Sequence, residues 1–418
     1  MSENENYALR PIPKEERTGI TAPLFNLLGC NIAISELMVG GTLITGLSFK
    51  NMLIASIIGN LILVLILVVQ GNIGCREGLN TYVLADGVFG EKAGKWIISL
   101  ILGISSFGWF GIQAGVAGLS VQKILPNVNL TITIIILGIL MMVIAVIGFK
   151  AMAIFNYVAI PPLILLMIWG LIKVFSGGSN LSVSSYVPKN PISLVDGINI
   201  VVGLVIVGVI ISPDYLRYSR RLKDIFVIGL VSFAGISIFQ QVAAALLSMQ
   251  APSWDITKVL SDLGFNWVAF VILILAAWST NLSNAYSGGL ALKTIFPNSD
   301  RKKLTAIAGI IGTLIAASGI IFKFQQFLSI LSLTIPSIGG IMWTEYYIVN
   351  KRKLVMRKDT NWCALIAWVI GFAISYFSNK FKFGLPPING IVFSGIVYLI
   401  LENTFDKKNI NERKVEKA

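Results

Sequence analysis

Residues 24–46 read LFNLLGCNIAISELMVGGTLITG. The stretch is apolar and long enough to cross a lipid bilayer, which takes about 20 residues of helix. Small and polar residues nevertheless lie near its middle, namely Gly29, Cys30, Asn31, Ser35 and Glu36. A bilayer allows the backbone to leave the helix only where protein or water binds the freed N–H and C=O groups. We therefore expect an interrupted helix here, with carbonyl groups available to a cation.

The composition agrees with an integral membrane protein. Of the 418 residues, 55% are hydrophobic and only 13% are charged, which leaves too little polar surface for a water-soluble globule. The net charge of +13 does not indicate a nucleic-acid partner, because the basic residues form short clusters between apolar segments. There is no histidine, and the three cysteines lie far apart without a CxxC motif. We therefore expect neither an enzyme nor a bound cofactor.

Apolar segments of membrane-spanning length recur along the chain and predict an all-α protein with twelve transmembrane helices. The expected spans are 20–46, 52–72, 94–122, 130–148, 152–175, 193–216, 223–249, 264–290, 302–320, 324–349, 362–378 and 386–404. With both termini inside, most of the 33 Lys and Arg fall on the cytoplasmic side, as the positive-inside rule requires. Residues 1–18 and 406–418 would then be cytoplasmic tails of a multi-pass protein in a bacterial-type plasma membrane.

The sixth span carries a second weak point. Gly203 and Gly208 flank an apolar tetrad, and Pro213 follows near the inner end. The two flawed spans, the first and the sixth, stand five helices apart. This offset is typical of five-plus-five inverted repeats, here 19–175 and 193–349 followed by a helix pair in 362–405, in which the substrate site lies between two discontinuous helices. Glycines that only allow close helix packing are the alternative interpretation.

Two further spans carry polar groups at mid-membrane depth. Trp109 and Gln113 lie one turn apart in the third span, so an indole and an amide could face one planar heterocycle. In the eighth span, Ser279 and Thr280 with the carbonyl of Ala276 offer three oxygens to a hard cation. The alternatives are a tryptophan that fills a helix junction and hydroxyls that bond back to their own helix. These groups favour a membrane transporter for a flat ring over a channel or a membrane enzyme.

The order of several short motifs resembles the nucleobase:cation symporter-1 family, most closely its bacterial cytosine permease branch. The resemblance runs over nearly the whole chain. It rests on Pro11, Ile12, Pro13 and Arg17; Gly40, Gly41, Thr42 and Leu43; Gly108, Trp109, Phe110 and Gly111; Asp214, Tyr215, Arg217 and Tyr218; Trp278, Thr280 and Asn281; and Pro336, Gly339 and Gly340.

This resemblance implies a LeuT-like fold in which a planar base and a sodium ion, or a proton, cross together by alternating access. It maps the cation site onto five residues, Gly29, Ile32, Ala276, Ser279 and Thr280. It also implies an ion pair between Asp214 and Arg217 at the inner face. The tenth span would act as a gate with a hinge at Pro336, Gly339 and Gly340.

Departures from the family pattern bear on the substrate. Val205 and Val207 stand where cytosine carriers have an aromatic residue and a serine, Gln113 resembles a glutamine of the hydantoin carriers, and Glu36 adds a carboxylate within the membrane. We expect substrate contacts from Trp109, Gln113, Glu36, Asn31, Val205, Val207, Asn281 and Asn284. An aminopyrimidine such as cytosine is the first choice. Hydroxymethylpyrimidine, hydantoin, a purine or an amino acid remain alternatives, and the oligomeric state is not indicated.

Overall fold

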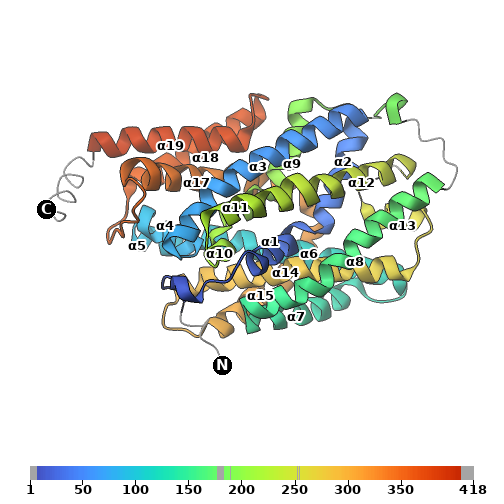
Figure 1. The fold of residues 1–418 in the computed structure, drawn as a ribbon, viewed down its shortest axis with the longest axis horizontal. Helices are drawn as coiled ribbons and strands as arrows, with labels where there is room; N and C mark the ends of the chain where they lie inside the picture. The colour runs from blue at the N-terminus through green and yellow to red at the C-terminus, as the bar shows by residue number, and fades with distance from the viewer. Residues whose placement is uncertain (1–6, 177–182, 189, 252, 254, 406–418) are drawn as a thin grey trace.

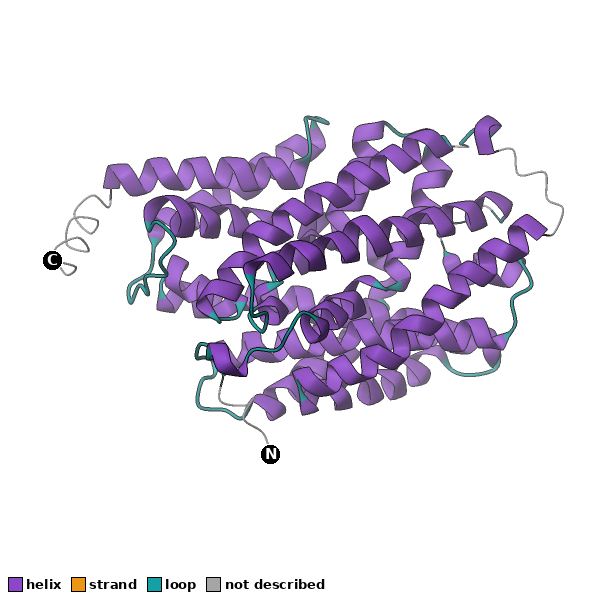
Figure 2. Cartoon of the chain, viewed as in Figure 1, coloured by secondary structure: helices purple, strands orange, loops and turns teal. Residues whose placement is uncertain are grey.

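The computed structural model describes residues 7–176, 183–188, 190–251, 253 and 255–405, so the expected tail 406–418 lies outside the described residues. The described chain is almost entirely helical (Figure 2). Its long helices lie side by side along the longest axis of the molecule (Figure 1). The N-terminal segment, α4, α5 and α10 lie toward the left end of that view, which we call the N-terminal end. α13 lies toward the right, which we call the opposite end.

The helices follow the expected order of spans. The first six expected spans contain α1 (Thr21–Asn31), α2 (Ile34–Gly46), α3 (Phe49–Glu77), α6 (Ser99–Ile124), α7 (Leu130–Ile147), α8 (Phe149–Ser176), α9 (Leu194–Ile210) and α10 (Pro213–Leu216). Two short helices, α4 (Thr81–Phe89) and α5 (Glu91–Ala93), lie between the second and the third expected span. The remainder contains α11 (Leu222–Gly229), α12 (Ile238–Gln250), α13 (Ile256–Asp262), α14 (Trp267–Ile295), α15 (Arg301–Ala317), α16 (Phe324–Thr334), α17 (Pro336–Trp343), α18 (Trp362–Lys380) and α19 (Pro386–Phe405).

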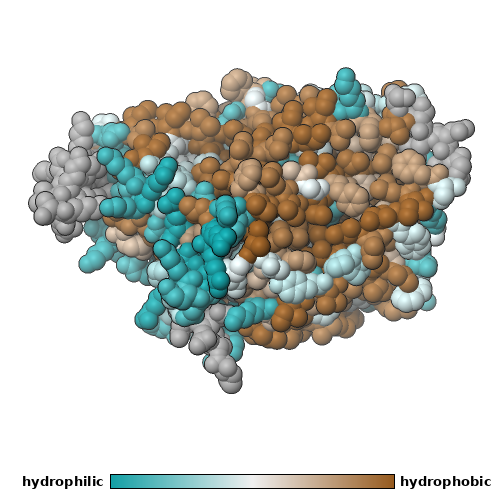
Figure 3. Space-filling model, viewed as in Figure 1, coloured by the Kyte–Doolittle hydropathy of each residue, from teal (hydrophilic) through white to brown (hydrophobic). Residues whose placement is uncertain are grey.

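By length and composition, nine helical segments of the described chain can cross a membrane, and the bent pair α1–α2 makes a tenth. α9 and α15, with 17 residues each, occupy the other two expected positions. Figure 3 shows hydrophobic residues over the middle of the visible face, with hydrophilic ones gathered toward its ends. Large apolar side chains such as Leu65 and Val158 are more than half exposed. Contact with lipid stabilises such an apolar surface, whereas exposing it to water is unfavourable.

The expected break in the first span is present. α1 ends at Asn31, α2 begins at Ile34, and the two segments are bent by 50°. Side chains from other helices bind the carbonyls that the break exposes. Gln240 Nε2 of α12 donates to the Asn31 carbonyl at 3.2 Å, and Thr280 Oγ1 of α14 donates to the Gly29 carbonyl at 3.2 Å. The break therefore ties three helices together.

The sixth span is also interrupted, and the interruption lies near Pro213 and not between the two glycines. α9 is continuous through Gly203 and Gly208 and ends at Ile210, just before the short α10 that starts at Pro213. Proline has no N–H and disfavours helix in the residue before it, which explains this position. Gln70 Nε2 of α3 donates to the freed Ile210 carbonyl at 2.8 Å.

The N-terminal segment is part of the packed structure from residue 7 onward. The Ile12 N–H donates to the Gly78 carbonyl at 3.0 Å, and the Arg17 guanidinium donates to the carbonyls of Ile12 and Cys75. Gly78 has a φ of +69°, and a Cβ there would lie 3.0 Å from the Ile12 backbone. Ser219, just after α10, forms an isolated parallel bridge with Thr18. Residues 7–18 therefore cover the C-terminus of α3 and the residues that follow α10.

Candidate substrate and cation site

A small cavity lies where four spans meet. These are the two broken spans, α1–α2 and α9–α10, and the helices α6 and α14. The accessible volume of this cavity is about 60 Å³, which is the space of a few water molecules. Among the expected substrate residues, those that line it are Asn31, Glu36, Trp109, Gln113, Val205, Val207 and Asn284. Residues that were not expected there include Cys30, Ser105, Ser106, Leu204, Gly208 and Tyr215. Most of the expected contacts therefore converge on one place.

Gln113 is the most informative side chain of this cavity. It is 1% exposed, and neither its amide oxygen nor its amide nitrogen has a hydrogen-bond partner in the described part of the chain. The amide nitrogen of Asn31, 2% exposed, has none there either. Buried polar groups are nearly always hydrogen-bonded, and an exception needs an explanation. Both amides line the cavity, so water or a polar ligand there can pair with them.

Trp109 forms the aromatic wall of the cavity. Its ring lies edge-to-face with two rings of α16, with centroid distances of 6.1 Å to Phe324 and 5.7 Å to Phe327. Gly108 makes room for this contact, because a Cβ at that position would lie 2.3 Å from the Phe327 ring. α16 is therefore packed directly on the indole that faces the cavity.

Glu36 is buried with neutral hydrogen-bond donors. Its Oε2 accepts from Gln241 Nε2 at 2.7 Å, and its Oε1 accepts from Ser237 Oγ at 3.3 Å. The Gln241 amide is held in this orientation because its oxygen accepts from Ser56 Oγ at 2.6 Å and from Asn60 Nδ2 at 3.1 Å. A carboxylate oxygen can accept more than one hydrogen bond. Glu36 thus keeps acceptor capacity toward the cavity.

Two residues of the eighth span do not belong to the cavity. Asn281 donates to the Phe110 carbonyl at 3.1 Å and to the sulfur of Met141, and it does not line this cavity. Its oxygen accepts from Asn284 Nδ2 at 3.1 Å, which positions the Asn284 side chain that does line the cavity. Trp278 packs against Phe155 of α8 instead.

Four of the five expected cation ligands form a tight oxygen cluster beside the first break. The Gly29 carbonyl lies 3.3 Å from Ser279 Oγ and 3.2 Å from Thr280 Oγ1, and Thr280 Oγ1 lies 3.1 Å from the Ala276 carbonyl. Ile32 lies in the bend itself, where its N–H donates to Leu28. Asn156 of α8, which sequence reasoning missed, lies next to the cluster and accepts from Ser279 Oγ at 2.8 Å.

The three separations are those of hydrogen bonds that the Ser279 and Thr280 hydroxyls donate, and the same spacing is compatible with a hard cation. Oxygens around a cation of calcium or sodium size lie about 2.4 Å from it, so neighbours in an octahedron are roughly 3.4 Å apart. The observed separations of 3.1 to 3.3 Å are close to that value. A bound cation would supply the positive charge that these oxygens together attract.

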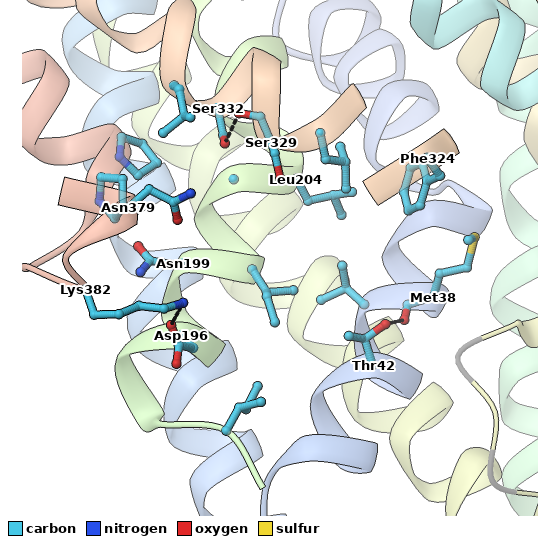
Figure 4. A pocket seen from close by; sticks show the side chains of 18 residues that line it. Met38, Thr42, Asp196, Asn199, Leu204, Phe324, Ser329, Ser332, Asn379 and Lys382 are labelled. Carbon is cyan, nitrogen blue, oxygen red and sulfur yellow. Dashed lines mark hydrogen bonds and ion pairs between the residues drawn. The ribbon is translucent and has the colours of Figure 1, made fainter. Parts of the chain in front are cut away.

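A larger cavity of about 410 Å³ lies between α2, α9, α16, α18 and α19. In Figure 4 the polar side chains of Asp196, Asn199 and Lys382 lie across this cavity from Thr42. Lys382 Nζ and Asp196 Oδ1 form an ion pair at 3.2 Å. Leu204 lines both this cavity and the small one. We call the larger cavity the vestibule, because it adjoins the site at Leu204.

The N-terminal end of the bundle is densely packed below the site. Tyr215 donates to the Ser283 carbonyl at 3.1 Å and lies 2.8 Å from Ser287 Oγ. Tyr218 stacks on Phe149, with ring centroids 3.9 Å apart, and its hydroxyl lies 3.2 Å from that of Tyr286. These contacts join α10 and the residues after it to α8 and α14. They form a seal between the site and this end.

Asp214 and Arg217 are both buried in the seal, but the expected ion pair between them is not formed within the described residues. Arg217 donates to the Tyr7 carbonyl at 2.8 Å and to the Tyr286 hydroxyl at 3.2 Å. Asp214 Oδ1 accepts from the Thr81 N–H, the first residue of α4, at 3.0 Å. Each side chain therefore bonds a different neighbouring segment.

The tenth span is interrupted where the sequence places its proline. α16 ends at Thr334 and α17 starts at Pro336. The two glycines serve close packing: a Cβ on Gly339 would lie 2.4 Å from Ile210, and one on Gly340 would lie 2.1 Å from the Ile391 carbonyl. This leaves Pro336 as the candidate hinge between α16 and the tightly packed α17.

Two broken helices, a polar cavity at their junction and a cation-sized oxygen cluster define a secondary membrane transporter. The chain matches over residues 11–399 the family described as permeases for cytosine/purines, uracil, thiamine and allantoin. It belongs to this family, the nucleobase:cation symporter-1 transporters, and the expected family resemblance is confirmed.

Individual relatives agree with this assignment. The chain is 31% identical to the cytosine permease of Escherichia coli K12 across 98% of its own length and 97% of the relative. It is 23% identical to the hydantoin permease of Microbacterium maritypicum, covering 88% and 82% of the two chains. The solved structure of Mhp1, a transporter of this family with bromovinylhydantoin bound, matches with a TM-score of 0.84 at 21% identity, over 95% and 96% of the chains. The expected LeuT-like fold with discontinuous first and sixth helices is thereby confirmed.

We predict that Tyr215→Phe weakens the seal, because phenylalanine fills the same space without the hydrogen bonds to α14. Loss of about 1 kcal/mol corresponds to a roughly fivefold higher population of the state open at the N-terminal end. Cys30 lines the cavity, so its rate of labelling by a maleimide added at the N-terminal end of the bundle reports this opening. The other two cysteines are removed by Cys75→Ser and Cys363→Ser. Tyr376→Phe on exposed α18 is the matched control. Equal labelling of both variants would contradict the role of Tyr215.

Proposed function

We propose that this transporter imports a planar, amino-substituted nucleobase, with cytosine or a related aminopyrimidine as substrate and sodium as the coupling ion. The observation that carries the proposal is the unpartnered amide of Gln113 in the cavity between the broken helices. A primary amide offers one acceptor and two donors, which complements the adjacent carbonyl and ring nitrogen of a base. The relation to a cytosine permease supports the same substrate class.

Glu36 favours an amino-substituted ring over an imide. Its carboxylate accepts from an exocyclic amino group, and a proton held between Glu36 and the neighbouring ring nitrogen completes a two-point contact. Hydantoin and uracil place carbonyl oxygens there, whose lone pairs repel a carboxylate. Hydroxymethylpyrimidine shares the amino edge and is therefore the closest alternative substrate. Purines and amino acids remain the further candidates, and a proton is the alternative coupling ion.

Alternating access would use the asymmetry between the vestibule and the seal. The vestibule would face the outside, and α16 would close over the bound base by bending at Pro336. The N-terminal end would face the cytoplasm, with both termini, and would open when the contacts of Tyr215 and Arg217 separate. Residues 19–175 and 193–349 would be the inverted repeats. Ligand and cation would each raise the affinity for the other by the same factor.

The substrate class is tested by uptake of labelled cytosine into cells or proteoliposomes that contain the protein. We expect saturable uptake that unlabelled cytosine and hydroxymethylpyrimidine inhibit, with hydantoin, uracil and amino acids at least tenfold weaker. Inhibition by neither aminopyrimidine would remove the substrate proposal. Stronger inhibition by amino acids would favour an amino acid carrier.

For the cation site, we predict that Ser279→Ala combined with Thr280→Ala abolishes sodium stimulation of uptake, because two of the clustered oxygens are lost. Both methyl side chains fit the space of the originals, so expression and melting temperature should change little. Ser332→Ala, at the vestibule, is the control that should leave stimulation intact. Uptake by the double variant that still depends fully on sodium would show that the site is wrongly placed.

For the substrate site, we predict that Glu36→Leu weakens cytosine binding by about 100-fold, the value of two lost polar contacts. Glu36→Gln should retain much of the binding, since an amide can accept from the amino group and donate to the ring nitrogen. Gln241→Leu removes the partner of Glu36 without altering the cavity lining, and it controls for lost stability. Isothermal titration in detergent measures all three. Equal affinity of Glu36→Leu and Gln241→Leu would limit Glu36 to a structural role.

A further inference from the structure

Asn156 is a fully buried polar residue of α8 that lies at the break of the first span. Gly29 permits this approach, because a Cβ there would lie 2.4 Å from Asn156 Nδ2 and 2.9 Å from its Oδ1. Any other residue at position 29 would displace the amide. The fifth span thus reaches the oxygen cluster, although the sequence offers no signal for it.

The orientation of the Asn156 amide is fixed by its own hydrogen bonds. Nδ2 donates to the Phe25 carbonyl at 3.2 Å and to Asn26 Oδ1 at 3.3 Å. Asn26 is in turn held by its Nδ2, which lies 3.4 Å from the Phe149 carbonyl. Two acceptors therefore face the nitrogen of Asn156. Its oxygen must face the other way, where it accepts from Ser279 Oγ at 2.8 Å.

This arrangement decides where the Ser279 hydroxyl hydrogen points. The hydroxyl has two acceptors within reach, Asn156 Oδ1 at 2.8 Å and the Gly29 carbonyl at 3.3 Å. When the Ser279 hydroxyl hydrogen points to Asn156 Oδ1, the lone pairs of Ser279 Oγ can face the cluster. When it points to the Gly29 carbonyl, the hydrogen lies between two oxygens that a cation needs. The shorter contact, to Asn156, is the one that keeps the hydrogen out of the cluster.

We infer that Asn156 is a positioning residue of the cation site, which draws the Ser279 hydroxyl hydrogen away so that the lone pairs of Ser279 Oγ face the ion. The inference rests on the proposed sodium coupling. It goes beyond the five expected ligands, because it makes α8 a part of the site. Asn156 acts through Ser279, so its contribution disappears when the Ser279 hydroxyl is absent.

A double-mutant cycle on the purified full-length protein tests this dependence. The readout is the sodium concentration that gives half of the maximal thermal stabilisation in the absence of substrate, with potassium at equal ionic strength as the reference. Asn156→Leu keeps the side-chain volume but removes the acceptor, and we expect it to raise that concentration about tenfold. Ser279→Ala should raise it by a similar or larger factor. The double variant should match Ser279→Ala within about twofold.

The possible outcomes distinguish the role of Asn156 from sodium coupling itself. A sodium effect on the unmodified protein that equals the potassium effect would overturn sodium coupling, and the inference with it. A sodium effect that Asn156→Leu leaves unchanged would overturn the inference alone. If the double variant raised the half-maximal sodium concentration by the product of the two single factors, Asn156 would act independently of Ser279 and would only stabilise the fold. Ser332→Ala, which lies at the vestibule and away from the cluster, should leave the sodium concentration unchanged.

Discussion

The structure depends on one constraint: lipid cannot hydrogen-bond the backbone groups that a broken helix releases. The carbonyls of Gly29, Asn31 and Ile210 are released at the two breaks, and each is bound by a side chain from another helix. Those side chains come from α3, α12 and α14. The breaks therefore bring polar groups from several helices to one depth, and the cavity and the oxygen cluster follow from that convergence.

The polar groups at the centre have unequal surroundings on the two sides. Toward the opposite end, Leu204 and the rings of α16 separate the cavity from a vestibule of about 410 Å³. Toward the N-terminal end, tyrosines, Arg217 and residues 7–18 fill the space. The barrier to the vestibule consists of apolar contacts, whereas the seal consists largely of hydrogen bonds. Opening the seal therefore requires that water hydrates the polar groups whose hydrogen bonds are broken.

The sequence was sufficient where function depends on spacing along one helix, and insufficient where it depends on partners far away in the chain. Thr280 and Asn284 lie one turn apart and share the cavity, whereas Asn281 is rotated by about 100° and faces α6 and α7. Gly203 lines the vestibule and Gly208 lines the small cavity, whereas the actual break depends on Pro213. The partners of Glu36 and Ser279, on α12 and α8, could not be deduced from local pattern because only tertiary packing brings them close.

The bridge between Thr18 and Ser219 has a consequence for biogenesis. The two residues are about 200 positions apart, so at 5–20 residues per second Thr18 leaves the ribosome roughly 10 to 40 seconds before its partner exists. During that interval the N-terminal segment can make its contacts with Cys75 and Gly78 but not the bridge to Ser219. Five spans must already be inserted before α10 completes the surface that receives it. The seal is thus assembled late, which keeps the two halves of the chain from being joined at this end before both are in the membrane.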